Sequence, residues 1–118
     1  MQDLKQNLIV DLTFQFALEI IEFSEFLQSK KKFKLADQLF KSGTSIGANV
    51  REAQNAESKA DFIHKMKIAA KEADETEYWL LLCKHSSTYP DADVLLEKTT
   101  VIIKILSKII GTSKRSRQ

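Results

Sequence analysis

The chain is poor in the residues that interrupt helices or cross-link small folds. Its 118 residues include 3 Gly, 1 Pro and 1 Cys. So few glycines and prolines argue against a turn-rich sheet fold and favour long helices. A single cysteine excludes an intramolecular disulfide and is typical of a reducing compartment. The sequence therefore predicts a cytoplasmic protein in which Cys83 is a buried structural thiol rather than a nucleophile.

Long apolar runs are missing as well. No uninterrupted apolar stretch approaches the roughly 20 residues that a membrane-spanning helix needs. Residues 1–5 lack a basic region followed by an apolar run, so we expect no signal peptide. A chain of this length can bury one core without disulfides or metals, and we therefore expect a single soluble domain.

Neither sign of charge dominates. The net charge is +2, and residues 111–118 contribute three cations and no acid, which leaves −1 for the remainder. A near-neutral body with a basic tail is not typical of a dedicated DNA-binding domain, which usually presents a basic face.

Apolar residues recur every three to four positions in four segments, as on the buried side of an amphipathic helix. We predict helices at about 12–29, 34–56, 59–85 and 90–110, followed by a disordered basic tail at 112–118. Short connections between them predict an all-α fold, an antiparallel up-down-up-down four-helix bundle. The predicted core seams are Phe16, Ile20, Phe23 and Leu27; Leu35, Leu39, Ser42 or Gly43, Ile46, Val50 and Ala53; Phe62, Met66, Ala69, Ala73, Thr76, Leu80 and Cys83; and Val94, Leu95, Val101, Ile102, Ile105 and Ile109.

Short polar side chains mark the expected helix starts. Asp11 or Thr13 is expected to cap the first helix. Ser58 and Asp61 have the spacing of a capping box at the start of the third helix. Thr88 is expected to cap the fourth.

Two clusters have an alternative function that we weigh against a structural one. Lys30, Lys31 and Lys32 follow the first helix, where the helix dipole favours cations; a phosphate-contacting loop is the alternative. Gly43 and Gly47 lie four residues apart and allow another backbone to approach closely, which offsets a helix-propensity cost of about 1 kcal/mol each. A phosphate-binding loop is disfavoured there, because no Gly-Lys-Ser/Thr triplet follows and no strand pattern precedes.

The third helix carries an excess of apolar residues. Residues 79–83, Trp-Leu-Leu-Leu-Cys, point in every direction around a helix, whereas one bundle core covers only about a third of a helix surface. We therefore predict a homo-oligomer with an interface at Tyr78, Trp79, Leu81 and Leu82. The alternative is a terminal turn covered by loops of the same chain.

Residues that support catalysis are few and poorly grouped. Asp61 and His64 form half of the pattern of carboxylate-bridged metal bundles, but the second acid–histidine pair is missing. The acids at 72–77 are expected to form a solvated face, with a Lys71–Glu75 pair, or to meet Arg51 on another helix or subunit. We predict no enzyme, no catalytic residue, no metal, no cofactor and no small-molecule substrate.

One basic stripe is a candidate for nucleic-acid contact. His64, Lys67 and Lys71 share a helical face that leads to Tyr78, an arrangement that can meet phosphates and stack a base. Acids directly after this stripe weaken the prediction. The topology also puts the 30–34 lysines and the basic tail at opposite ends of the bundle, so one copy cannot join them into one patch.

Three sequence blocks carry a family resemblance. Residues 42–53, 61–65 and 71–80 read SGTSIGANVREA, DFIHK and KEADETEYWL. Together they resemble, over roughly residues 12–110, the four-helix-bundle family of bacterial 23S rRNA-intervening-sequence proteins. The resemblance implies an antiparallel bundle that assembles into a ring, usually a pentamer, without enzymatic activity. A more distant similarity, to the basic pentameric accessory protein of diversity-generating retroelements, implies RNA or DNA binding by the ring as an alternative function.

Overall fold

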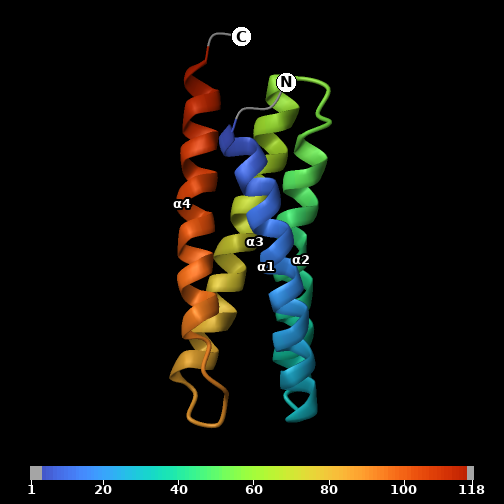
Figure 1. Cartoon of the computed structure of the whole chain (residues 1–118), viewed down its shortest axis with the longest axis vertical. Helices are drawn as coiled ribbons and strands as arrows, with labels where there is room; N and C mark the ends of the chain where they lie inside the picture. Colours follow the sequence, from blue (N-terminus) through green and yellow to red (C-terminus); the bar gives the residue numbers. More distant parts are fainter. Residues whose placement is uncertain (1–3, 117–118) are drawn as a thin grey trace.

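A computed structural model describes residues 4–116 of the chain, with side chains from residue 8 onwards. The described chain forms four helices: α1 (Leu4–Ser29), α2 (Phe33–Ala53), α3 (Lys59–His85) and α4 (Asp93–Arg115). Successive helices run in opposite directions (Figure 1). Each helix packs on the next, and α4 closes the cycle by packing on α1, so that α1 and α3 lie diagonally across the bundle. The predicted all-α four-helix bundle is confirmed.

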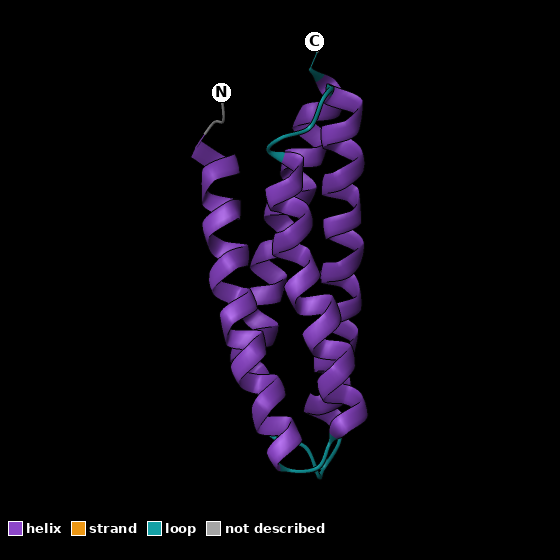
Figure 2. Ribbon diagram, turned by 90° about the vertical axis from the view of Figure 1, so that its right-hand side faces the viewer, coloured by secondary structure: helices purple, strands orange, loops and turns teal. Residues whose placement is uncertain are grey.

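The bundle measures 50 × 20 × 19 Å, and its two ends differ. The α1–α2 and α3–α4 connections lie together at one end, here called the loop end (Figure 2). There the Lys32 Nζ lies 3.5 Å from the Thr88 Oγ1. At the other end, here called the termini end, the Lys59 Nζ donates a hydrogen bond to the Ser116 carbonyl. The loop lysines and the C-terminal cations are therefore separated by the length of the bundle, as predicted.

The start of α1 differs from the prediction. The helix begins at Leu4, so neither Asp11 nor Thr13 caps it. Thr13 is buried instead, and its hydroxyl donates to the Ile9 carbonyl of the preceding turn at 2.7 Å. A threonine satisfied in this way is compatible with a helix interior and a dry core.

The start of α3 agrees with the prediction, whereas α4 differs at both ends. The Ser58 Oγ accepts a hydrogen bond from the Asp61 N–H at 3.0 Å, which confirms the predicted cap. Thr88 does not cap α4, which begins at Asp93. The helix continues to Arg115, so the predicted disorder is wrong for residues 112–115, and residues 117–118 lie outside the described part.

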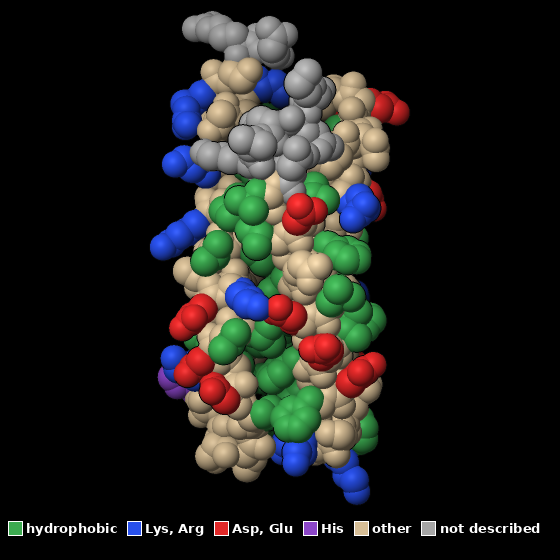
Figure 3. Space-filling model, viewed as in Figure 1, with side chains coloured by type: hydrophobic (Ala, Val, Ile, Leu, Met, Phe, Trp, Pro, Cys, Tyr) green, Lys and Arg blue, Asp and Glu red, His purple; other side chains and the backbone are tan. Residues whose placement is uncertain are grey.

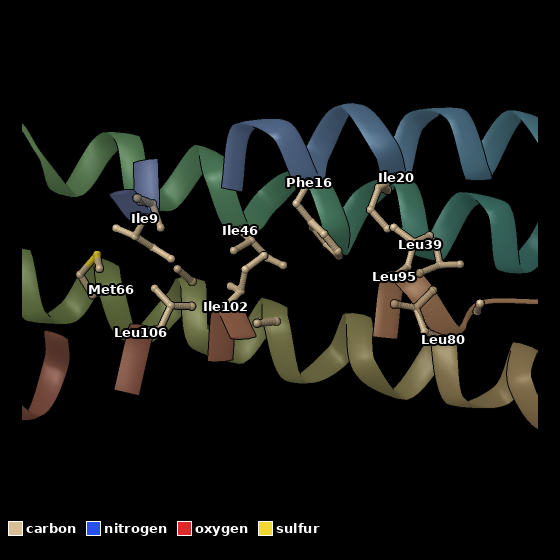
Figure 4. Packing of buried hydrophobic residues seen from close by; sticks show 14 of the residues in the cluster. Ile9, Phe16, Ile20, Leu39, Ile46, Met66, Leu80, Leu95, Ile102 and Leu106 are labelled. Atoms are coloured by element: carbon tan, nitrogen blue, oxygen red, sulfur yellow. The ribbon is translucent and has the colours of Figure 1, made fainter. Parts of the chain in front are cut away.

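The core is one continuous column along the bundle axis (Figure 4). Its largest enclosed side chains include Phe16, Ile20, Leu39, Ile46, Met66, Leu80, Ile102 and Leu106. The seams predicted for the first three helices are largely confirmed, although Phe23, Leu35 and Phe62 are only partly buried. The α4 seam is partly wrong: Val94 and Val101 are exposed, and Thr99 and Leu106 are buried.

Small residues set the spacing between the first three helices. A Cβ on Gly43 would lie 2.7 Å from the Ile20 Cγ2, and one on Gly47 would lie 3.1 Å from the Thr13 carbonyl oxygen. The predicted close approach is therefore confirmed, and the helix that approaches is α1. On the other side of α2, the Thr76 hydroxyl of α3 donates to the Ser42 Oγ at 2.9 Å.

Candidate interaction surfaces

The apolar block of α3 is divided between the core and the surface. Leu80 and Cys83 are buried, whereas Tyr78, Leu81 and Leu82 are 56%, 39% and 42% exposed. Trp79 is partly buried, and its Nε1 donates to the Glu75 Oε2 at 3.1 Å. We call Tyr78, Leu81 and Leu82 the α3 ridge. The interface assigned to it and to Trp79 stays a prediction.

Hollows flank the α3 ridge on both sides. Between α2 and α3, a hollow of about 450 Å³ is lined by Lys34, Leu35, Gln38, Trp79, Leu82, Ser86 and Tyr89. Between α3 and α4, a hollow of about 340 Å³ is lined by Glu77, Leu81, Lys84, Asp93, Leu96, Glu97 and Thr100. The ridge therefore projects between two depressions. This shape is one against which the surface of a second copy can pack.

A second exposed apolar surface lies over α1 and α2, and the sequence analysis did not identify it. Phe14, Leu18 and Phe40 are 49%, 45% and 48% exposed. A trough of about 190 Å³ lies beside them, lined by Val10, Phe14, Ala17, Thr44, Gly47, Ala48 and Arg51. The Arg51 guanidinium lies 5.8 Å from the centre of the Phe14 ring. We call this surface the α1–α2 trough. The sequence indicates it only through Phe14 and Leu18, two large apolar residues that lie outside the Phe16–Ile20 core seam of α1.

The two pairs of helices differ in charge, but the connections remove most of the difference. Helix α1 has one lysine and four carboxylates, and α2 has three cations and two carboxylates, so these helices sum to −2, and the three lysines that connect them bring residues 4–53 to +1. Helix α3 has five of each sign, and α4 has five cations and two carboxylates, so these helices sum to +3, and Asp91 between them brings residues 59–115 to +2. Figure 3 shows Lys and Arg side chains projecting along the edge that α4 forms in the upper half of the view.

The candidate stripe for nucleic acid is exposed, and the structure extends it in an unexpected direction. His64, Lys67 and Lys71 all lie at the surface of α3. A side-chain hydrogen bond with Lys114 of α4, and next the charge of Lys114, lower the pKa of Lys67. No acid follows Glu97 in the sequence, so the second half of α4 adds only cations beside α3. We missed this surface because the tail was expected to be disordered.

The acids of α3 follow the prediction only in part: Asp74 and Glu75 are exposed, as expected for a solvated face, but the predicted ion pair is not found among the described residues. No Lys71–Glu75 ion pair forms in the described chain, since the Glu75 carboxylate accepts the Trp79 indole N–H. Burial, and next the charge of Glu75, raise the pKa of Glu72, while Lys41 of α2 and Lys71 act against this. Arg51 of the same chain packs on Phe14 rather than on these acids.

The described residues offer no assembled reaction centre. The Asp61 carboxylate lies near Lys65 at 3.8 Å and accepts the Glu57 N–H at 3.2 Å, while His64 is exposed. Nowhere in residues 4–116 do three His, Cys, Asp or Glu side chains gather as metal ligands would. Cys83 is buried as predicted, and burial raises the pKa of its thiol to about 11, which keeps it protonated.

None of the helices in the described chain combines the length and the apolarity of a membrane span.

Fold and surfaces together define an all-α four-helix-bundle protein with two exposed apolar surfaces. The chain belongs to the 23S rRNA-intervening sequence protein family, whose family model matches residues 5–108. It is similar to a solved protein of unknown function from the S23 ribosomal protein family of Bacteroides thetaiotaomicron, with a TM-score of 0.87 and 42% identity over 92% of this chain and 99% of the other. A comparison with curated proteins gives no significant match. The resemblance drawn from the three sequence blocks is confirmed.

Proposed function

We propose that the protein is a non-enzymatic, cytoplasmic assembly module whose copies associate head to tail into a closed ring, with five copies as the expected number. The observation that carries the proposal is the pair of exposed apolar surfaces on different halves of the bundle. Contiguous exposed apolar surface marks interaction sites in soluble proteins. Five copies is the number that the family resemblance implies.

The shapes of the two surfaces favour a head-to-tail arrangement over a two-fold one. A two-fold dimer built on one of these surfaces would place two ridges or two troughs against each other. A heterologous contact instead joins the α1–α2 half of one copy to the α3–α4 half of the next. It also lets the projecting α3 ridge meet the α1–α2 trough. Repeated by a rotation that closes, this contact gives a ring.

The mass in solution tests the proposal. Size-exclusion chromatography with light scattering should give about five times the 13.5 kDa of one chain. A monomer at micromolar concentration would overturn it. A dimer that does not grow with concentration would also contradict it, because it indicates a two-fold contact.

A second candidate function is binding of RNA or DNA by the α3–α4 cations. The specific observation is that the exposed stripe of His64, Lys67 and Lys71 on α3 lies on a helix that packs against α4, whose second half carries only cations. One of these cations, Lys114, is close enough to lower the pKa of Lys67. A phosphate between the two ammonium groups would relieve their repulsion. These residues lie toward the termini end, about 20 Å along α3 from the ridge at 1.5 Å per residue.

Binding at different salt concentrations tests this second function. Affinity for a labelled RNA or DNA should fall steeply with salt, and Lys67→Glu with Lys114→Glu should flatten the slope. Lys41→Glu, at an exposed lysine of α2 outside both proposed nucleic-acid sites, is the control. Unchanged binding by the first pair, or no binding of any nucleic acid at low salt, would remove this candidate.

A further inference from the structure

The loop end gathers lysines and aromatic rings around one hollow. Four lysines occur within residues 30–34, and no acid occurs from residue 26 to residue 36. Tyr89 and Trp79 line the adjacent α2–α3 hollow, and Lys34 lines it too. This end of the bundle borders the α3 ridge, since Leu82 also lines the hollow, but it is distinct from the α3–α4 cations of the second candidate function.

The loop lysines contact aromatic rings rather than carboxylates. The Lys32 Nζ lies 4.8 Å from the centre of the Tyr89 ring, and the Lys30 Nζ lies 5.5 Å from that of Phe26. Within the described chain, none of the four lysines forms an ion pair. Cation–π contacts at exposed sites are weak and easily exchanged, so the ammonium groups stay available to an anion.

Lys31 occupies a backbone position that glycine fills at lower cost. The turn after α1 is a Schellman motif: the Lys32 N–H donates to the Leu27 carbonyl and the Lys31 N–H donates to the Gln28 carbonyl, each at 2.8 Å. Lys31 is the left-handed residue of this motif, with φ 64°. A side chain there carries a conformational cost that glycine avoids. The geometry of the turn does not explain why residue 31 is a lysine rather than a glycine, whereas a contact between its ammonium group and a phosphate does explain it.

The α2–α3 hollow has the chemistry of a base-binding site. Its volume of about 450 Å³ lies within the roughly 300–1,000 Å³ of small-ligand sites. Trp79 and Tyr89 contribute aromatic surface, and Gln38 and Ser86 contribute hydrogen-bonding groups. Stacked bases of a duplex cannot enter such a hollow, whereas the unstacked base of a single strand can.

We propose that the loop end binds single-stranded nucleic acid, with one base in the α2–α3 hollow and the flanking phosphates on Lys31 and Lys34. The site shares a ligand class with the second candidate function but uses none of its residues. It also does not require the ring, although a ring would repeat the site on one rim.

The only tryptophan of the chain provides a direct readout. Trp79 lines the hollow, so a base that enters should quench its fluorescence. The protein is titrated with oligo(dT) and with oligo(U) of equal length, and in parallel with a duplex of that length and with inorganic polyphosphate. Quenching by either single strand, with little by the duplex or the polyphosphate, is the expected result, and the stronger of the two identifies DNA or RNA. Equal responses to polyphosphate, or no quenching by either strand, overturn the proposal.

Two variants separate binding from folding. Lys31→Gly should fold with a melting temperature at least equal to that of the wild type, yet bind the strand several-fold more weakly. Lys34→Gln should weaken binding similarly and reduce the salt slope by about 0.7, the value for one lost phosphate contact on a single strand. Lys41→Gln, at an exposed lysine of α2 outside both proposed nucleic-acid sites, is the control and should leave binding unchanged. Wild-type affinity in both loop variants contradicts the proposal.

The mass of each sample, measured in parallel, keeps the proposals distinguishable. A ring of the expected mass without quenching removes the base-binding site and leaves the ring. A monomer that is quenched removes the ring and leaves the site.

Discussion

The two halves of the bundle differ in packing and in surface shape. In the α1–α2 half, Gly43 and Gly47 bring two helices close together, and the outer surface is a trough beside exposed phenylalanines. In the α3–α4 half, the outer surface is a projecting ridge between two hollows. Each half therefore complements the other better than it complements itself.

This difference gives the direction of association a physical basis. An exposed apolar surface alone predicts only that something covers it. Two surfaces of complementary shape, a ridge and a trough, predict that the same molecule supplies both partners, in a repeating contact. The predictions below test whether the halves really differ in this way.

The largest expected effect is loss of assembly when either apolar surface is given a charge. Leu81→Glu on the α3 ridge and Phe14→Lys at the α1–α2 trough would each bury a charge in an apolar contact. Each should cost a central contact of about 2 kcal/mol or more, roughly a 30-fold weaker association per interface. Light scattering should then report a mass near that of one chain.

Helix content by circular dichroism should stay at the wild-type level in both variants, because Leu81 and Phe14 are exposed. Val94→Lys, on an exposed residue outside both surfaces, is the control and should leave the mass unchanged. A wild-type mass for both surface variants would show that these surfaces are not the interface.

The close packing of the α1–α2 half predicts the next largest effect. Gly43→Val places methyl groups against Ile20 and should lower the free energy of unfolding by about 1–3 kcal/mol. Gly111→Ala in α4 would meet only the end of the Arg115 side chain, at 3.4 Å, so it should be stabilising by up to about 1 kcal/mol. Urea denaturation measures the free energy of unfolding of both variants. If both substitutions changed it in the same direction, the difference in packing between the halves would be contradicted.

The buried thiol of the α3–α4 half predicts a dependence on alkaline pH. Because burial raises the pKa of Cys83 to about 11 from 9.0, the unfolded chain loses this proton first. The contribution of the protonated thiol to the free energy of unfolding is fully present below pH 9 and is lost as the pH rises to 11; it amounts to at most roughly 2–3 kcal/mol. The difference in free energy of unfolding between the wild type and Cys83→Ala, measured across this range, removes the contribution of the lysines, because both proteins share it. Parallel stability curves for the two proteins would contradict the buried, protonated thiol.

The smallest effect is expected at the ion pair that joins the two halves. The Lys98 Nζ of α4 lies 2.6 Å from the Glu19 Oε2 of α1. Both side chains are substantially exposed, and such pairs contribute about 0–1 kcal/mol. Lys98→Ala should therefore change the free energy of unfolding by less than about 1 kcal/mol at moderate salt. A much larger loss would mean that this contact, rather than the core, holds α4 against α1.

Much of the fold could be predicted because periodicity and capping agree. The Ser58 cap and the Leu39, Ile46 and Met66 seam positions follow directly from the sequence. Two threonines explain why other core positions could not be identified. Thr13 and Thr99 are buried because each hydroxyl bonds to a carbonyl of its own helix, and a polar residue type does not reveal that.

The interaction surfaces could be predicted only in part. Five consecutive apolar residues on α3 exceed what one core can cover, so an exposed ridge was a safe inference from the sequence. The α1–α2 trough was not, because its floor depends on how closely Gly47 brings α2 to α1. The Lys67–Lys114 contact depends on α4 continuing past Gly111, where no apolar period remains to signal a helix.

The head-to-tail contact is tested most directly by mixing the two surface variants. Leu81→Glu retains an intact α1–α2 half, and Phe14→Lys retains an intact α3–α4 half. Each should be a monomer alone, and an equimolar mixture should form a heterodimer through the one remaining good interface, with a mass of about two chains by light scattering. Dimers of either variant alone, or a mixture that stays monomeric, would contradict the account.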